Sequence, residues 1–174
     1  MTKIIFTEIE TERLLLRKPS ISDWPVVSYL RSDEEVNKFV KRSSAKTKEE
    51  AIAFIEKNLK DINSHKIVAW FISEKSSAVM IGSICLWNFS EDKSIAEVGY
   101  DLKPEFQGRG IMDEALKAVI AYGFNKLSLD KIEAFTGNLN ENSKKLLIRN
   151  HFLLNPERRD ESNPDNIIFE LENN

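Results

Sequence analysis

The chain has 174 residues, with 25 Lys and Arg against 28 Asp and Glu, and a formal net charge of −3 at pH 7. This length predicts a single domain over residues 1–174 with a sizeable core. The near balance of charge argues against a broad nucleic-acid-binding face. The sequence shows no secretory start, no long apolar run and one cysteine, Cys85. These features predict a cytoplasmic protein without an internal disulfide or a membrane span.

The first half of the chain is predicted to contain a strand, a group of helices and a strand pair. Thr47 and Glu50 form a capping-box pattern at the start of the longest of these helices. The expected elements are a strand over 13–17, a helix capped by Ser22 and ending near Arg31, a short helix over 33–39, a helix from Thr47 to about Ile62, and strands over 67–73 and 79–87.

The middle of the chain combines an alternating segment, a glycine-rich loop and an amphipathic segment. Residues 95–102 alternate as a strand does, except at Gly99, which predicts a β-bulge that frees backbone hydrogen-bonding groups. Apolar residues at spacings of three and four predict a helix over 110–127. Between them, Gly108 and Gly110 flank an arginine. Such a loop before a helix N-terminus can bind phosphate through backbone N–H groups, although a plain strand-to-helix turn would use glycines as well.

The C-terminal part is predicted to complete the sheet. We expect a strand over 131–136, a helix that begins at Asn140, and strands over 152–154 and 167–171 joined by a solvated loop. Asn150, at the end of that helix, is predicted to adopt the positive φ that a helix C-terminus often needs.

A dinucleotide-binding fold is the main competing explanation of Gly108-x-Gly110. That fold expects a third glycine where Asp113 stands. Its acidic residue, about twenty positions further on, would be Asp130, which opens a strand instead of closing one. A triphosphate-binding loop is excluded, because no Gly-Lys-Ser or Gly-Lys-Thr occurs in the chain.

Four motifs, each weak alone, together make a specific signature. They are Gln107-x-x-Gly110-x-Met112, Thr11 to Arg17 near the start, Glu97-Val98-Gly99-Tyr100, and Asn140-x-x-Ser143 with Phe152 behind it. On these motifs the chain resembles the GCN5-related N-acetyltransferase (GNAT) family, in its ribosomal-protein N-terminal (RimJ/RimL-like) branch. The resemblance implies an α+β, three-layer fold with a mixed, mostly antiparallel central sheet flanked by helices. It also implies acetyl-coenzyme A as cosubstrate.

The resemblance also implies a set of binding residues. The pantetheine arm would lie along the 100–102 segment and pair with it like an added strand, and the pyrophosphate would occupy the 107–112 loop. Met112, where the family has glycine or alanine, must then point its side chain away from the phosphates. The residues expected to bind acetyl-coenzyme A are Val98, Tyr100, Asp101, Leu102, Gln107, Gly108, Arg109, Gly110, Ile111, Met112, Asn140 and Ser143.

Acetyl transfer requires a neutral amine, a donor for the oxyanion and stabilisation of the departing thiolate. Glu97 is the expected proton acceptor, and backbone N–H groups around Val98 and Gly99 are expected to polarise the thioester. Ser143 matches the serine that the branch has near the coenzyme sulfur, so the resemblance implies that it donates a proton or a hydrogen bond to the departing thiolate. Leu147 stands where many family members have a tyrosine, which shifts any acid role toward Ser143. The structural alternatives are a surface charge for Glu97 and helix capping for Ser143 and Asn140.

The acceptor remains open at this stage. The resemblance implies the N-terminal α-amino group of a ribosomal or other protein. A small-molecule amine, or a non-catalytic acetyl-coenzyme A sensor, stays as an alternative, and a homodimer is compatible with the resemblance. No ligand cluster with metal-binding spacing is present. The aromatic residues that we consider for a substrate pocket are Trp24, Tyr29, Phe39, Trp70 and Trp87.

Overall fold

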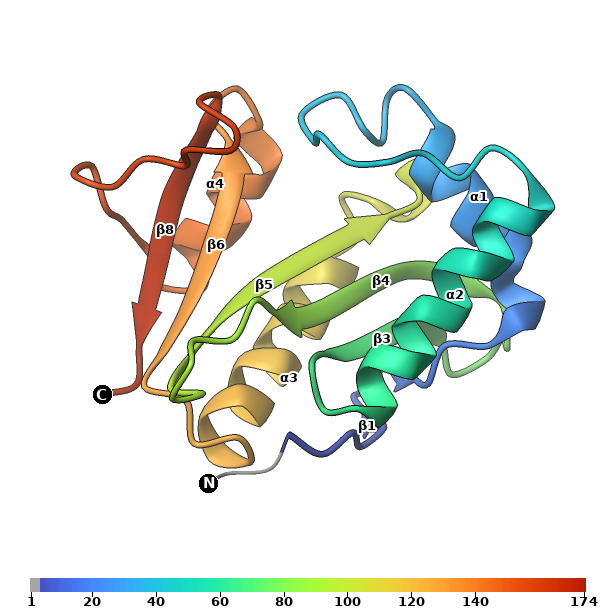
Figure 1. Cartoon of the computed structure of the whole chain (residues 1–174), viewed down its shortest axis with the longest axis horizontal. Coiled ribbons are helices and arrows are strands. Elements are labelled where there is room, and N and C mark those ends of the chain that lie inside the picture. Colours follow the sequence, from blue (N-terminus) through green and yellow to red (C-terminus); the bar gives the residue numbers. More distant parts are fainter. Residues whose placement is uncertain (1–3) are drawn as a thin grey trace.

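The computed structural model describes residues 4–174, which form one eight-stranded sheet with helices on both faces (Figure 1). The strands are β1 (Ile9–Glu10), β2 (Leu14–Arg17), β3 (Val68–Glu74), β4 (Met80–Trp87), β5 (Ile95–Leu102), β6 (Lys131–Gly137), β7 (Leu153–Leu154) and β8 (Asn166–Glu172). The helices are α1 (Trp24–Ser32), α2 (Lys48–Asn63), α3 (Ile111–Asn125) and α4 (Glu141–Arg149), with short 3-10 turns η1 (Ile21–Asp23) and η2 (Pro104–Phe106).

The sheet is mixed and mostly antiparallel, as predicted. Its strand order is β1-β2-β3-β4-β5-β6-β8-β7, and β5–β6 is the one parallel pair among the described strands. A dinucleotide-binding fold needs an extended parallel sheet, so this topology excludes that alternative.

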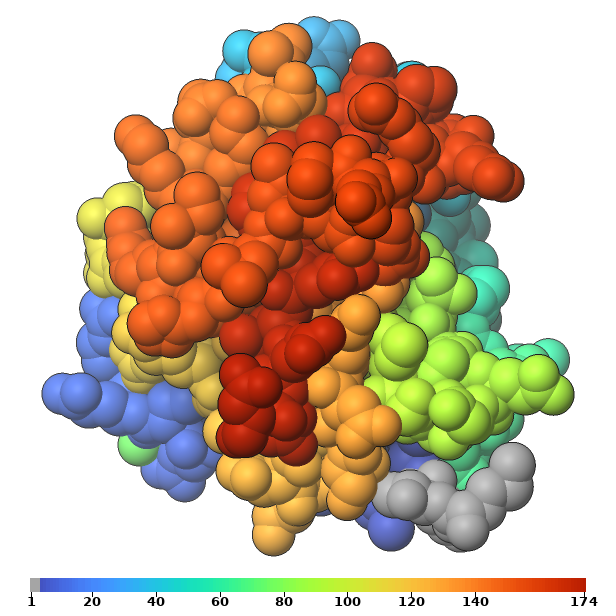
Figure 2. Space-filling model, turned by 90° about the vertical axis from the view of Figure 1, so that its left-hand side faces the viewer, coloured from blue at the N-terminus to red at the C-terminus, as the bar shows by residue number. Residues whose placement is uncertain are grey.

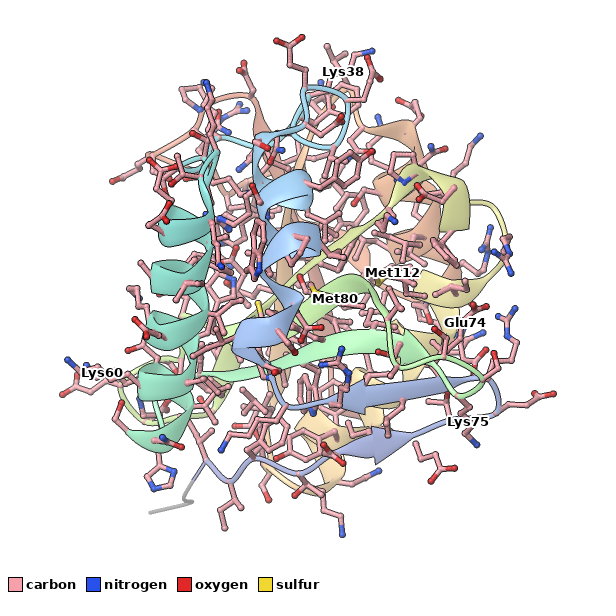
Figure 3. All side chains as sticks on the ribbon, turned by 90° about the vertical axis from the view of Figure 1, so that its right-hand side faces the viewer. Lys38, Lys60, Glu74, Lys75, Met80 and Met112 are labelled. Atoms are coloured by element: carbon pink, nitrogen blue, oxygen red, sulfur yellow. The ribbon has the colours of Figure 1, made fainter. Side chains whose placement is uncertain are left out.

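Two apolar layers hold the helices to the sheet. On one face, α1 and α2 pack on β3 and β4 through a core that includes Leu30, Ile55 and Met80. On the other face, α3 and α4 pack through a larger core that includes Met112 and Leu147. Figure 3 labels both methionines. The sheet therefore separates two distinct faces, one for each helix pair.

The sequence correctly predicted α2, where Thr47 and Glu50 form the capping box. It was wrong for residues 33–39, which form turns instead of a helix. There, Asn37 Nδ2 donates to the carbonyls of Leu30 and Asp33, and Asp33 Oδ1 accepts from the Val36 N–H. Such side chain-to-backbone bonds compete with helical pairing.

Helix α1 also starts differently from the prediction. The capping residue is Ser20, which caps η1 in a capping box with Asp23, and Asp23 itself is the N-cap of α1. Pro25 still lies in the first turn, as expected from its fixed φ and missing N–H. The predicted cap at Ser22 is therefore wrong, by one residue for α1 and by two for η1.

Gly99 does not form the predicted bulge. The β4–β5 register runs without a shift through Cys85↔Gly99, and the irregularity of this half of the sheet lies between Ile72 and Ser73. A side chain at position 99 would start 3.4 Å from Cys85 Sγ and 3.6 Å from Trp87 Nε1. The glycine therefore accommodates close cross-strand neighbours.

β5 does have free backbone hydrogen-bonding groups, but they arise from its divergence from β6 and not from a bulge. Pairing between β5 and β6 covers only Ile95↔Lys131 to Glu97↔Glu133. Beyond Glu97, β5 stays with β4 while β6 stays with β8, so the two halves of the sheet diverge (Figure 1). The edge of β5 that faces β6 therefore lacks a strand partner from Val98 onward among the described residues.

The end of α4 also differs from the prediction. His151 has the positive φ, 68°, whereas Asn150 has φ −95°. Asn150 is instead buried, and its Nδ2 donates to Asp113 Oδ1 and to the Leu146 carbonyl, both at 2.9 Å. The side chain thus ties α4 to the first turn of α3. Within residues 4–174, no helix has the length and apolar character needed to cross a membrane.

Candidate active site

The predicted site residues lie on β5 from its divergence from β6 onward, in the loop that leads to α3, and at the start of α4. Alternation along β5 places Glu97 and Asp101 on the face that carries α1 and α2, and it places Val98 and Tyr100 on the face of α3 and α4. Two contacts confirm this: Arg42, in the loop after α1, pairs with Asp101, and Tyr100 reaches Ser143 of α4. The site therefore draws on both faces of the sheet.

The glycine-rich loop leads directly into α3. Gly108 and Gly110 both have positive φ, 72° and 73°, and Gly110 is the N-cap of the helix. A Cβ at Gly108 would meet nothing within 4 Å, and one at Gly110 would meet only Arg13 Nη2 at 3.4 Å. This open backbone at the positive end of a 15-residue helix suits an anionic ligand.

The other loop residues fix its shape. Gln107 Nε2 donates to the Leu102 carbonyl at 3.1 Å, which ties the loop to the end of β5. Arg109 is exposed, pairs with Glu74 at 3.4 Å and lies over the Phe106 ring. The first two residues of α3, Ile111 and Met112, are buried at 2% and 9% exposure. Met112 therefore points into the core, away from the open side of the loop.

The N-terminal motif, Thr11 to Arg17, holds this loop through hydrogen bonds. Arg13 donates from Nη1 to the Arg109 carbonyl at 2.9 Å and from Nε to Glu114 at 2.7 Å. Thr11 and the Arg13 backbone N–H both donate to the other oxygen of Glu114. We call Thr11, Arg13 and Glu114 the loop support. It joins the turn between β1 and β2 to α3 and to the loop, and it gives a physical reason for the motif near the start of the chain.

Replacing Arg13 with alanine is expected to weaken acetyl-coenzyme A binding roughly tenfold, because a charged hydrogen-bond network of this size contributes about 1.5–3 kcal/mol. Isothermal titration calorimetry measures the effect. Lys117→Ala is the matched control, since it removes an exposed ion pair with Asp113 on the same helix. Equal affinities of R13A and wild-type protein would show that the loop keeps its shape without this support.

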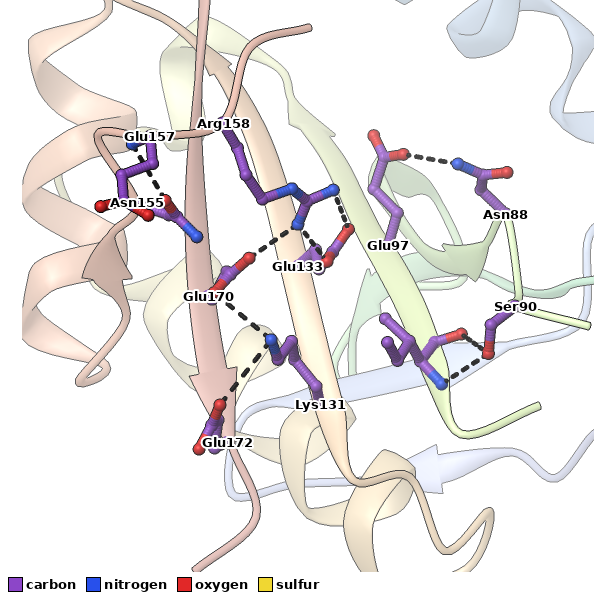
Figure 4. Close-up of polar contacts among 11 residues, drawn as sticks. Asn88, Ser90, Glu97, Lys131, Glu133, Asn155, Glu157, Arg158, Glu170 and Glu172 are labelled. Carbon is purple, nitrogen blue, oxygen red and sulfur yellow. Dashed lines mark hydrogen bonds and ion pairs between the residues drawn. The ribbon is translucent and has the colours of Figure 1, made fainter. Parts of the chain in front are cut away.

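Glu97 is half-buried at the point where the strands separate, and Asn88 Nδ2 donates to its Oε2 at 3.3 Å (Figure 4). Burial raises the pKa of Glu97 from 4.5 to about 7, the bond from Asn88 opposes the rise, and the carboxylates of Asp160 and Glu133 add to it. A carboxylate with a pKa near neutrality can accept a proton at physiological pH.

Arg158 is a residue of this site that the sequence prediction missed. It lies in the loop between β7 and β8 and pairs with Glu133 of β6 and Glu170 of β8 (Figure 4). Figure 2 shows this loop and β8, in dark orange to red, on one side of the molecule. Most of this loop is exposed, as the sequence predicts, and no sequence pattern distinguishes its arginine.

Tyr100 and Ser143 form a hydroxyl pair with an oxygen–oxygen distance of 2.7 Å. Burial raises the pKa of Tyr100 to about 12, against the opposing effect of this hydrogen bond. Ser143 is 8% exposed and lies in the first turn of α4, where its N–H donates to Asn140 Oδ1. Asn140 is thus the N-cap, the structural role considered for it, and Leu147 is fully buried.

The side chains of Asp101 and Val98 are occupied by contacts within the protein and are not available to a ligand. Asp101 accepts from Ser83 Oγ at 2.5 Å and from Arg42 at 3.0 Å. Val98 is 3% exposed in the core. Contact with a ligand at these positions and at Leu102 would therefore come through the unpaired backbone edge of β5.

The aromatic residues considered for a substrate pocket differ in burial and in position. Trp70 is fully buried and packs edge-on against Tyr122, so its assignment to a pocket is wrong. Trp24 packs on the core between the sheet and α1 and α2. Trp87 is 43% exposed and is the cross-strand partner of Glu97. It is therefore the aromatic side chain best placed beside the candidate base. Phe39 lies next to Gly137, at the far end of β6.

Cys85 lies on β4 opposite Gly99, as the prediction of a strand cysteine required. Burial raises the pKa of its thiol to about 12, which keeps it protonated and poorly nucleophilic. In the part of the chain that the structure describes, no group of three or more His, Cys, Asp or Glu is arranged to hold a metal ion.

A protein-family model, the acetyltransferase (GNAT) domain, matches residues 13–153. The chain therefore belongs to the GNAT acetyltransferase family, and it is an N-acetyltransferase. Among curated proteins it is similar to the uncharacterized N-acetyltransferase YoaA of Bacillus subtilis (strain 168), with 28% identity over 148 residues that cover 85% of this chain and 84% of YoaA.

Solved structures agree with the fold. The ribosomal-protein-S5-alanine acetyltransferase from Vibrio fischeri has a TM-score of 0.81 at 23% identity, covering 96% of this chain and 97% of that one. The microcin C7 self-immunity acetyltransferase MccE, solved with acetyl-coenzyme A and AMP, has a TM-score of 0.79 at 20% identity, covering 93% of each chain. At these identities the likeness establishes the shared fold.

Proposed function

We propose that this N-acetyltransferase acts on the N-terminal α-amino group of a protein, a ribosomal protein being the first acceptor to test. The observation that carries the proposal is the half-buried carboxylate of Glu97, with a pKa of about 7, at the divergence of β5 and β6. An acceptor of this class would place the enzyme in the cytoplasm. The S5-alanine acetyltransferase among the structural neighbours supports the choice of acceptor.

Acetyl-coenzyme A is the cosubstrate, and it supplies the acetyl group as a thioester. We assign its phosphates to the loop from Gln107 to Gly110 and the first turn of α3, whose open backbone and positive φ values fit an anion. We assign its pantetheine arm to the unpaired edge of β5, where backbone groups of Tyr100 to Leu102 can pair with an extended ligand.

The acid–base match favours an α-amine. An N-terminal ammonium has a pKa of about 8, whereas a lysine ammonium has one of about 10.4. Proton transfer to Glu97 is therefore nearly balanced for the α-amine, while for lysine it is uphill by about three pKa units. In this assignment, Glu97 accepts the proton directly or through a water molecule as the amine nitrogen attacks the carbonyl carbon.

The route is direct transfer. A backbone N–H group on the free edge of β5, from one of the two adjacent residues Val98 and Gly99, stabilises the oxyanion, the C–N bond forms and the C–S bond breaks. An acetylated enzyme is not expected, because the thiol of Cys85 stays protonated. Trapping an acetyl-enzyme on the reaction path would contradict this route.

Two alternatives to a protein N terminus as acceptor are considered. A small-molecule amine is supported by MccE, a neighbour whose name links it to microcin C7 immunity. A non-catalytic acetyl-coenzyme A sensor would bind the ligand without turnover, and the near-neutral pKa of Glu97 speaks against it.

A matched peptide panel tests the acceptor class. Each ribosomal-protein N-terminal sequence is supplied with a free α-amine and an internal lysine, or with a blocked α-amine and the same lysine. Free amino acids and polyamines are tested in parallel. We expect thiol release only with the free α-amine, and mass spectrometry should place the acetyl group at the N terminus.

Acetylation of the internal lysine, or a clear preference for a free small amine, would overturn the α-amine proposal while leaving the acetyltransferase assignment intact. Saturable acetyl-coenzyme A binding with no thiol release for any acceptor would favour the sensor.

A further inference from the structure

The two hydroxyls of Tyr100 and Ser143 share one hydrogen bond but carry two protons. Their oxygens are 2.7 Å apart, and neither makes another hydrogen bond to the described residues 4–174. Tyr100 comes from β5 and Ser143 from the first turn of α4. The pair therefore joins β5 to α4 beyond the point where β5 leaves β6, and one proton is left over.

The chemistry of the two groups decides which proton is left. A phenol is a stronger acid than an aliphatic alcohol, so the better donor is Tyr100 and the better acceptor is Ser143. Tyr100 also packs against the main core. With Tyr100 as donor, the hydroxyl proton of Ser143 is the one that remains free.

We propose that Tyr100 is a positioning residue that holds the Ser143 hydroxyl with its proton directed at the sulfur of coenzyme A. The inference deepens the proposed function and rests on its placement of the pantetheine arm along β5. It also takes from the sequence analysis the expectation that Ser143 interacts with the departing thiolate. Leu147 occupies the position of the tyrosine that many family members have, and it is fully buried. The Tyr100–Ser143 pair thus supplies, from β5 and α4 together, the polar group that Leu147 cannot supply.

The role is hydrogen bonding and involves no loss of the serine proton. A serine hydroxyl is far weaker as an acid than a thiol, whose pKa is about 8.5, so it cannot protonate the thiolate irreversibly. As the C–S bond breaks, sulfur takes the electron pair and accepts a hydrogen bond from Ser143. The proton that completes the thiol comes from solvent, and Glu97 returns to solvent the proton that it accepts from the amine. The first turn of α4 adds favourable dipole interaction.

The test measures the pKa of the coenzyme A thiol when it is bound, by ultraviolet absorbance of the thiolate, in wild-type protein, Tyr100→Phe, Ser143→Ala and the double variant. No acceptor is needed, so failure here is distinguishable from a wrong acceptor. Each single variant is expected to raise the bound thiol pKa by roughly 1, the value of one charged hydrogen bond. The double variant should match S143A, because Tyr100 acts through Ser143.

Turnover gives the second readout. Y100F is expected to lower kcat roughly tenfold with little change in KM for acetyl-coenzyme A, because the contact matters as charge develops on sulfur. Tyr122→Phe is the matched control, since it removes another buried phenol hydroxyl, one that donates to the Ile5 carbonyl far from this pair. Additive effects of Y100F and S143A, or an unchanged thiol pKa in Y100F, would overturn the proposal.

Discussion

Replacing Gly110 with glutamate is expected to reduce the affinity for acetyl-coenzyme A at least about a hundredfold, through strain and charge conflict together. Gly110 has φ 73° and is the N-cap of α3, so any side chain there is strained. A carboxylate would also stand at the positive end of the helix, where the phosphates are assigned. Isothermal titration calorimetry of the purified variant measures the loss.

Ser128→Glu is the control for this substitution. Ser128 is exposed, lies just beyond the C-terminal end of α3 and also has a positive φ, 55°. The same charge on a similar backbone, but away from the loop, should leave affinity unchanged. A G110E protein that stays folded and keeps wild-type affinity would remove the phosphate assignment of the loop.

Replacing Glu97 with glutamine is expected to lower kcat/KM roughly a hundredfold or more, the usual scale for loss of a general base. In the wild-type enzyme, kcat/KM for a peptide α-amine should rise with pH through a group of pKa about 7. The variant should lose this limb and show only the titration of the amine. Initial rates of thiol release from pH 5.5 to 9, a range of about three to four pH units around that pKa, test the prediction.

Asn88 and Glu172 provide the comparison for Glu97. Asn88→Ala removes the bond that opposes the rise in the pKa of Glu97, so the limb should move to higher pH. Glu172→Gln changes an exposed strand glutamate on β8 and should leave the profile unchanged. A pH limb that survives in E97Q would assign the base to another group.

The same shift predicts the direction of a stability effect. The folded-state pKa of Glu97 is above its ordinary value, so its contribution to stability is fully present below pH 4.5 and is lost as pH rises through about 7. E97Q should therefore match wild type at low pH. Above pH 7 it should be more stable, by on the order of 1 kcal/mol after allowance for partial exposure. Urea denaturation at both pH values measures this difference.

The sequence predicted most of what local patterns can specify. The helix after Gly110, the capping box at Thr47 and the alternation of β5 depend on neighbours within a few residues, and all three were confirmed. The family motifs then led to the correct sheet type, because their order along the chain matches the family.

Features that depend on distant partners were missed or misassigned. The Arg13–Glu114 contact joins residues about a hundred positions apart, and the pairing of Arg158 with Glu133 depends on how β6 and β8 lie side by side. The prediction of a bulge at Gly99 is wrong, because a glycine inside a strand gives the same local pattern whether it marks a bulge or a close cross-strand neighbour. The divergence of β5 from β6 has no local sign at all.

The most direct test of the account is a calorimetric titration of the wild-type protein with acetyl-coenzyme A, with a nicotinamide dinucleotide in parallel. The account predicts saturable binding of acetyl-coenzyme A at one site and no binding of the dinucleotide. Absence of acetyl-coenzyme A binding by the folded protein would contradict it, because the loop before α3 would then be only a structural turn and the proposed acetyl transfer would have no donor.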